Sequence, residues 1–68
     1  MDKDDGDIGG TVTEVLAGST FRVRLDDDSV VLAYAAGKAR RTLLRTTPGD
    51  RVRVQVTPLD PGRGRIVR

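Results

Sequence analysis

The chain has 68 residues and a net charge of +2, and it contains neither cysteine nor histidine. A domain of about 60 residues buries only roughly 60% of the surface that its unfolded chain exposes, which leaves little room for a deep catalytic cleft. The missing residue types exclude disulfides and thiolate sites and remove the commonest general base and metal ligand, so we expect no enzyme, no cofactor and no metal site.

Residues 1–9 are predicted to form a flexible acidic N-terminal tail. Four aspartates against Lys3 give this segment a net charge of −3, and Ile8 is its one apolar residue besides Met1. The segment lacks the apolar stretch of a signal peptide, and no run in the chain approaches the ~20 residues of a membrane span. We therefore expect a cytoplasmic protein whose folded domain covers residues 10–68.

Three antiparallel strands are predicted next. Residues 11–16 are rich in β-branched side chains, which favour a strand. Residues 21–25 give the clearest period of two in the chain, because three apolar residues alternate with two arginines, and we expect Phe21 in the core. The aspartate-rich turn at residues 26–29 leads into a third strand at residues 30–34. This acidic run lacks the ligand spacing of a calcium loop, so a hairpin turn is the simpler interpretation.

Residues 37–45 do not alternate and are predicted to form a short or partly irregular helix. On a helical wheel, Lys38, Arg41 and Arg45 fall within about 60° of each other and form a basic outer face. Arg40 falls among the apolar positions instead, where a structural role is the alternative.

The last part of the chain is predicted to hold two more strands. Residues 46–50 read as a turn, residues 51–56 as a fourth strand, residues 58–64 as a loop and residues 65–67 as a short closing strand. Three strands, a short helix and two strands are the layout of an all-β, five-stranded OB-fold barrel, a class that binds oligonucleotides. An SH3-like barrel also has five strands, but the helical insert between strands three and four favours the OB fold.

Positive charge is concentrated in the second half of the chain. Residues 37–68 carry nine cations against two aspartates, and ten of the twelve cations in the whole chain are arginine. A guanidinium forks onto phosphate and stacks on bases, so this half suggests a polyanionic partner. The codon usage of a GC-rich genome also produces many arginines, so composition alone leaves nucleic-acid binding open.

Five short motifs follow one another between residues 10 and 67. They are Gly10-Thr-Val-Thr-Glu14, Phe21-Arg-Val-Arg-Leu25, Gly37-Lys-Ala-Arg40 with Leu44-Arg45, Gly49-Asp-Arg-Val52, and Thr57-Pro-Leu-Asp60 with Gly64-Arg-Ile-Val67. In this order and at this spacing they resemble the bacterial translation initiation factor one family. The resemblance implies an OB barrel in the aminoacyl-tRNA site of the small ribosomal subunit, with contacts to ribosomal RNA, cooperation with the other initiation factors, and neither cofactor nor catalysis.

Several positions depart from the family pattern. The family usually has histidine, an aliphatic residue and serine before its Gly-Lys, methionine after the lysine, tyrosine at two further positions and leucine at another. This chain has Tyr34, Ala35, Ala36, Ala39, Leu43, Leu59 and Pro61 at those places. We therefore expect this chain to keep the family's cationic and backbone contacts to RNA more than its base-specific contacts. A divergent family member with an altered partner is also consistent with these substitutions.

Two groups of candidate RNA-binding residues follow. The basic face at residues 38–45 would neutralise phosphates, which supply most sequence-independent affinity, although a solvated helix face is the simpler interpretation of such a charge run. Strands two and three form the usual OB binding face, where arginines would enlarge the RNA-contacting area. Tyr34 is a better candidate than Phe21 for stacking on a base. The candidates are Lys38, Arg40, Arg41, Arg45, Arg22, Arg24, Tyr34 and Arg65.

Two other functions stay open from the sequence. An RNA chaperone of the cold-shock type needs aromatic stacking residues on strands two and three, which this chain largely lacks. A barrel whose basic face meets an acidic protein is the other alternative. We expect a monomer that binds the small ribosomal subunit and its RNA, acts with the other initiation factors and does not enter a membrane.

Overall fold

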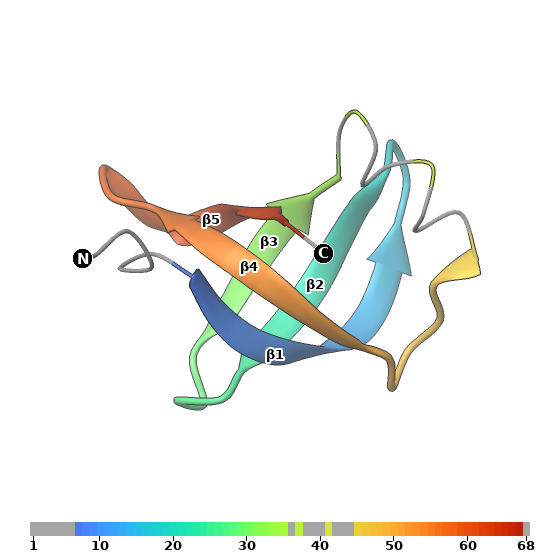
Figure 1. The fold of residues 1–68 in the computed structure, drawn as a ribbon, viewed down its shortest axis with the longest axis horizontal. Helices are drawn as coiled ribbons and strands as arrows, with labels where there is room; N and C mark the ends of the chain where they lie inside the picture. Colours follow the sequence, from blue (N-terminus) through green and yellow to red (C-terminus); the bar gives the residue numbers. More distant parts are fainter. Residues whose placement is uncertain (1–6, 36, 38–40, 42–44, 68) are drawn as a thin grey trace.

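Five strands close into a barrel in the computed structural model, which describes residues 7–35, 37, 41 and 45–67 (Figure 1). Around the barrel the order is β1-β2-β3-β5-β4, and β4 returns to β1. β3 and β5 run parallel, whereas the other neighbouring strands are antiparallel. The bounds are β1 Asp7–Leu16, β2 Thr20–Leu25, β3 Val30–Tyr34, β4 Arg51–Thr57 and β5 Asp60–Ile66.

This topology confirms the predicted all-β, five-stranded OB barrel. Consecutive strands form the β1-β2-β3 meander, and the long connection after β3 carries the chain across the barrel to β4. β1 closes the barrel because it is shared: its segment 7–11 pairs with β4 and its segment 10–16 pairs with β2. Within the described part of the chain, no helix is long and apolar enough to span a membrane.

Alternation along the strands fills the barrel interior. In β2, three apolar residues are buried and the two arginines between them are exposed, as predicted, and Phe21 lies in the core. β4 repeats the pattern with two buried valines between exposed polar residues. The buried core consists of Val12, Phe21, Val23, Leu25, Val31, Ala33, Ala35, Val52, Val54 and Ile66. Because valine and alanine dominate this set, the barrel is narrow.

β1 begins three residues before the expected boundary between tail and domain, which corrects that boundary. Asp7 pairs with Gln55, and Ile8 pairs with Val54. Ile8 packs against the core because it lies on the same side of the strand as the buried Val12, four residues later. This inward-facing isoleucine is the sequence signal for the longer strand. Residues 1–6 of the expected tail lie outside the described part of the chain.

The loop predicted over residues 58–64 is wrong for most of its length, because β5 begins at Asp60. The turn between β4 and β5 contains only two residues, and the register then shifts before Gly64, which pairs with Val56. Pro61 lies in this irregular stretch, where its missing N–H is tolerated. Here proline and glycine mark a bulge within a strand, and the short closing strand expected at the end of the chain is longer than predicted.

The connection between β3 and β4 ends in the predicted turn. Gly49 has a φ of 101°, in the left-handed region that glycine adopts readily. Its N–H donates to the Val12 carbonyl at 2.7 Å, and the Val12 N–H donates to the Asp50 carbonyl at 2.9 Å, so the turn is attached to β1. The helix expected over residues 37–45 falls mainly outside the described residues and stays a prediction.

We predict that Gly10→Ala destabilises the barrel by about 1–3 kcal/mol, as overpacking of a filled core does. A Cβ at Gly10 would lie 2.7 Å from the Val23 Cγ1 and 2.9 Å from the Arg24 carbonyl oxygen, so backbone has to move. Gly9→Ala is the control, because a Cβ there would meet the ends of exposed side chains, Asp26 and Arg51, and no backbone atom. Urea unfolding measures both variants, and equal stabilities would contradict the prediction.

Candidate functional site

The outward side of β3 is an exposed apolar stripe. Val31 and Ala33 point into the core, so Val30, Leu32 and Tyr34 point outward, and all three are exposed. Tyr34 is 48% exposed, in a chain whose other aromatic residue, a phenylalanine, is buried.

Arginines on the two neighbouring strands flank the stripe. On β2, Arg22 lies opposite Leu32, and on β5, Arg65 lies opposite Tyr34. Residues paired directly across neighbouring strands lie on the same face of the sheet, so these arginines share the outward face with the apolar side chains. We call this region the β3 surface, and it consists of Arg22, Arg24, Val30, Leu32, Tyr34, Arg63 and Arg65.

Polar partners orient some of these arginines without burying them. Arg22 forms an ion pair with Glu14, and both side chains are about half exposed. The Arg65 Nη2 donates to the Gln55 Oε1 at 2.7 Å. Exposed ion pairs contribute only about 0–1 kcal/mol, so an incoming anion can compete for these guanidiniums. An aromatic ring beside exposed guanidiniums is a combination that stacks on a base and contacts the adjoining phosphate.

The structure brings half of the predicted candidate residues together. Arg41 and Arg45 are exposed in the β3–β4 connection, and Lys38 and Arg40 lie outside the described residues. The sequence reasoning missed Leu32, although the alternation of residues 30–34 is the signal for its outward position. The candidates on the β3 surface are Arg22, Arg24, Tyr34 and Arg65.

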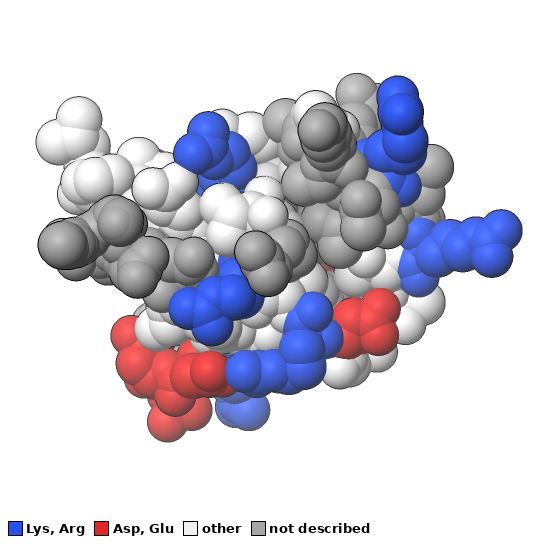
Figure 2. Space-filling model, in the orientation of Figure 1, with Lys and Arg blue, Asp and Glu red and all other residues white. Residues whose placement is uncertain are grey.

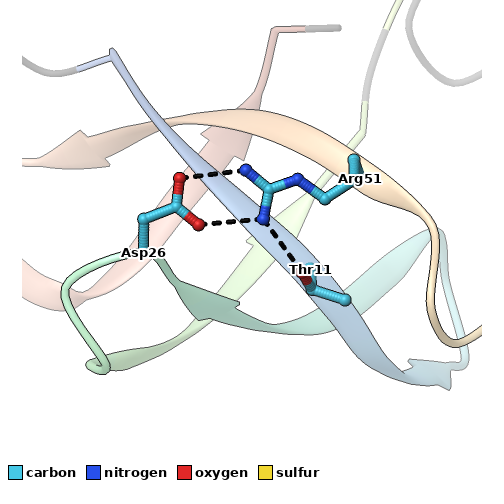
Figure 3. Close-up of polar contacts among 3 residues, drawn as sticks. All are labelled: Thr11, Asp26 and Arg51. Carbon is cyan, nitrogen blue, oxygen red and sulfur yellow. Dashed lines mark hydrogen bonds and ion pairs between the residues drawn. The ribbon is translucent and has the colours of Figure 1, made fainter.

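A second basic group lies on β4, where Arg51 joins three elements of the barrel (Figure 3). Its Nη1 and Nη2 donate to Asp26 Oδ1 and Oδ2 at 2.8 and 2.9 Å, and Nη1 also donates to Thr11 Oγ1 at 3.0 Å. Asp26 belongs to the β2–β3 turn and Thr11 to β1. This group, which we call the Asp26–Arg51 clasp, therefore connects the turn to the paired strands β1 and β4.

Opposite charges lie next to one another on this protein. Figure 2 shows acidic side chains in two groups in the lower half of the molecule, with basic side chains between and beside them. The hydrogen bonds from Arg51 lower the pKa of the Asp26 carboxyl below its ordinary value, and the charge of Arg53 acts in the same direction. The same hydrogen bonds to Asp26 raise the pKa of Arg51. Both groups therefore stay ionised over a wide pH range.

Comparison with known proteins assigns the family. The family model described as "Translation initiation factor 1A / IF-1" matches residues 1–68. The chain belongs to this family. The resemblance of its five motifs to bacterial initiation factor one is thereby confirmed.

Relatives in bacteria and chloroplasts are similar to this family member. Translation initiation factor IF-1 of Azorhizobium caulinodans is 60% identical over 57 residues, which are 84% of this chain and 63% of that protein. Chloroplastic translation initiation factor IF-1 of Garrya elliptica is 50% identical over 58 residues, or 85% of this chain and 75% of that protein. The chain thus spans less than two thirds of the length of the Azorhizobium relative.

Two solved structures share the barrel. The solution structure of translation initiation factor IF-1 from the Wolbachia endosymbiont strain TRS of Brugia malayi superposes with a TM-score of 0.68 at 38% identity, covering 91% of this chain and 74% of that one. The crystal structure of YjeQ from Thermotoga maritima gives a TM-score of 0.67 at 27% identity, with 91% of this chain and only 22% of that one. The same small barrel therefore also occurs as part of a larger protein.

We predict that Asp26→Asn removes part of the acid sensitivity of this family member. A carboxyl whose pKa is lowered in the folded state stabilises the fold above its unfolded value, near 3.8, and loses that contribution as the pH falls through the folded value. Below about pH 4 the free energy of unfolding should fall more steeply for the wild type than for Asp26→Asn.

Urea unfolding from pH 6 down to pH 2 measures this difference. Asp28→Asn, which removes a carboxylate from the same turn and leaves the Asp26–Arg51 hydrogen bonds in place, is the control. Parallel curves for wild type and Asp26→Asn would show that the clasp carries no pH dependence.

Proposed function

We propose that this chain is a non-enzymatic translation initiation factor that binds the small ribosomal subunit in its aminoacyl-tRNA site through ribosomal RNA. The observation that carries the proposal is the match of the Translation initiation factor 1A / IF-1 family model to the whole chain. In this role the protein acts in the cytoplasm as a monomer and supports assembly of the initiation complex with the other initiation factors. The acidic tail expected over residues 1–9 stays a proposal for the part that precedes β1.

The β3 surface supplies a physical means for this binding. Its arginines neutralise RNA phosphates and release condensed counterions, which gives affinity that falls with salt. The apolar side chains of its stripe can pack against ribose and base instead of water, and Tyr34 can stack on a base. The segment 36–45 follows Ala35 in the sequence and carries four further cations that we include in the binding site. These cations are Lys38, Arg40, Arg41 and Arg45.

A folded RNA suits this surface better than a free single strand. Proteins that bind single strands line up several aromatic rings to stack successive bases. Here Tyr34 is the one ring available, because Phe21 is buried in the barrel. Binding through phosphates with one stacked base fits recognition of RNA shape, as in a ribosomal site, more closely than the action of a cold-shock chaperone.

We predict that Tyr34→Ala weakens binding to small ribosomal subunits by about 1–3 kcal/mol, the value of one stacked base. Leu59→Ala is the matched control, because Leu59 is 96% exposed in the turn between β4 and β5 and is not one of the residues of the β3 surface. Binding is measured by fluorescence anisotropy of the labelled protein at several potassium chloride concentrations. The wild-type affinity should fall steeply with salt.

Two results would contradict the proposal. If the wild type does not bind small subunits even at low salt, the function is wrong. If it binds but Tyr34→Ala and Leu59→Ala have equal affinities, the protein uses another surface. Tight binding to unstructured RNA without ribosomes would favour the chaperone instead.

A further inference from the structure

Two arginines of β4 converge above a glycine of β1, outside the β3 surface. Gly9 pairs with Arg53, and Arg51 is the next outward-facing residue along β4. A Cβ placed on Gly9 would lie 3.1 Å from Arg51 Nη2, 3.6 Å from Arg53 Nη1 and 2.9 Å from Asp26 Oδ2. Two guanidiniums and one carboxylate therefore share the space that a side chain at Gly9 would fill.

This place is hollow as well as charged. A shallow pocket of about 300 Å³ is lined by Gly9, Arg51, Val52 and Arg53. Glycine in a strand often marks a position where another group approaches the backbone closely. The pocket is thus bordered by the Gly9 backbone and by two arginines.

We propose that Arg51 and Arg53, on either side of this pocket above Gly9, form a subsite for a phosphodiester of the RNA backbone, and that Asp26 occupies Arg51 when RNA is absent. The inference rests on the proposed function, to which it adds a second contact region on β4. Asp26 acts here as an internal competitor, since its carboxylate takes the place that a phosphate takes in the complex.

The geometry of the clasp suits an exchange of one anion for another. Arg51 holds Asp26 through two parallel N–H···O bonds, and a guanidinium grips phosphate with the same fork. The pair is largely in water, with 61% of the Arg51 side chain and 53% of the Asp26 side chain exposed, so opening it costs little. Thr11 still accepts a hydrogen bond from Arg51 at 3.0 Å and keeps the guanidinium in place.

The subsite also lies within reach of the β3 surface. Arg65 of that surface pairs with Gln55 of β4, and Arg53 is the next outward-facing residue on the same strand. A folded RNA that contacts β5 can therefore extend its backbone over β4. The acidic turn at residues 26–28 limits the footprint beyond this point by repulsion.

The test compares Asp26→Asn with Asp28→Asn, which removes the same charge from the same turn. Both variants are first shown to fold by circular dichroism and thermal unfolding. Their affinity for small ribosomal subunits is then measured as a function of potassium chloride. At low salt, Asp26→Asn should bind roughly three- to tenfold more tightly than Asp28→Asn, with a slope of log affinity against log salt steeper by about 0.7–0.9, the value for one added phosphate.

The double variant Asp26→Asn/Arg51→Gln shows whether the gain passes through Arg51. It should lose the extra affinity and the extra slope. Equal affinities for Asp26→Asn and Asp28→Asn, or a gain that survives in the double variant, would overturn the subsite while leaving the proposed function intact. Absence of binding by the wild type and every variant would overturn the proposed function, and the subsite with it.

Discussion

A closed barrel of this size has room inside for only one side chain in two, and every other feature of the molecule follows from that constraint. The interior accepts valine, alanine and a few larger apolar residues, and no charged side chain is buried in the described part of the chain. Each strand therefore sends its alternate residues to solvent. Among the described residues no second layer of structure covers them, so these outward residues are available to a partner.

The outward residues divide into two basic regions. Around β3, arginines border an apolar stripe that ends in Tyr34, an arrangement suited to a base and its flanking phosphates. On β4, Arg51 and Arg53 face a glycine and an aspartate, an arrangement suited to a phosphate alone. The barrel itself provides rigidity, because closure leaves the strands no free edge along which to shift. The proposed RNA binding needs this positioning.

The sequence predicted the parts of the fold that depend on local periodicity. β2 and β4 alternate strictly, so their buried and exposed faces could be assigned before the structure was known. The ends of β1 and β5 could not, because Ile8 and Pro61 lie among turn-forming residues and only their cross-strand partners hold them in strands. The Asp26–Arg51 clasp joins residues 25 positions apart and has no local signal. For the same reason the sequence suggested Arg22 and Arg65 as candidates without showing that both border one apolar stripe.

The most direct measurement is a cryo-electron microscopy map of the chain bound to the small ribosomal subunit together with the other initiation factors. The barrel should occupy the aminoacyl-tRNA site, with Tyr34, Arg65 and residues 38–45 in contact with ribosomal RNA. A barrel that turns its β3 surface to solvent, or an aminoacyl-tRNA site without density for this chain, would contradict the proposal that these outward-facing residues bind RNA.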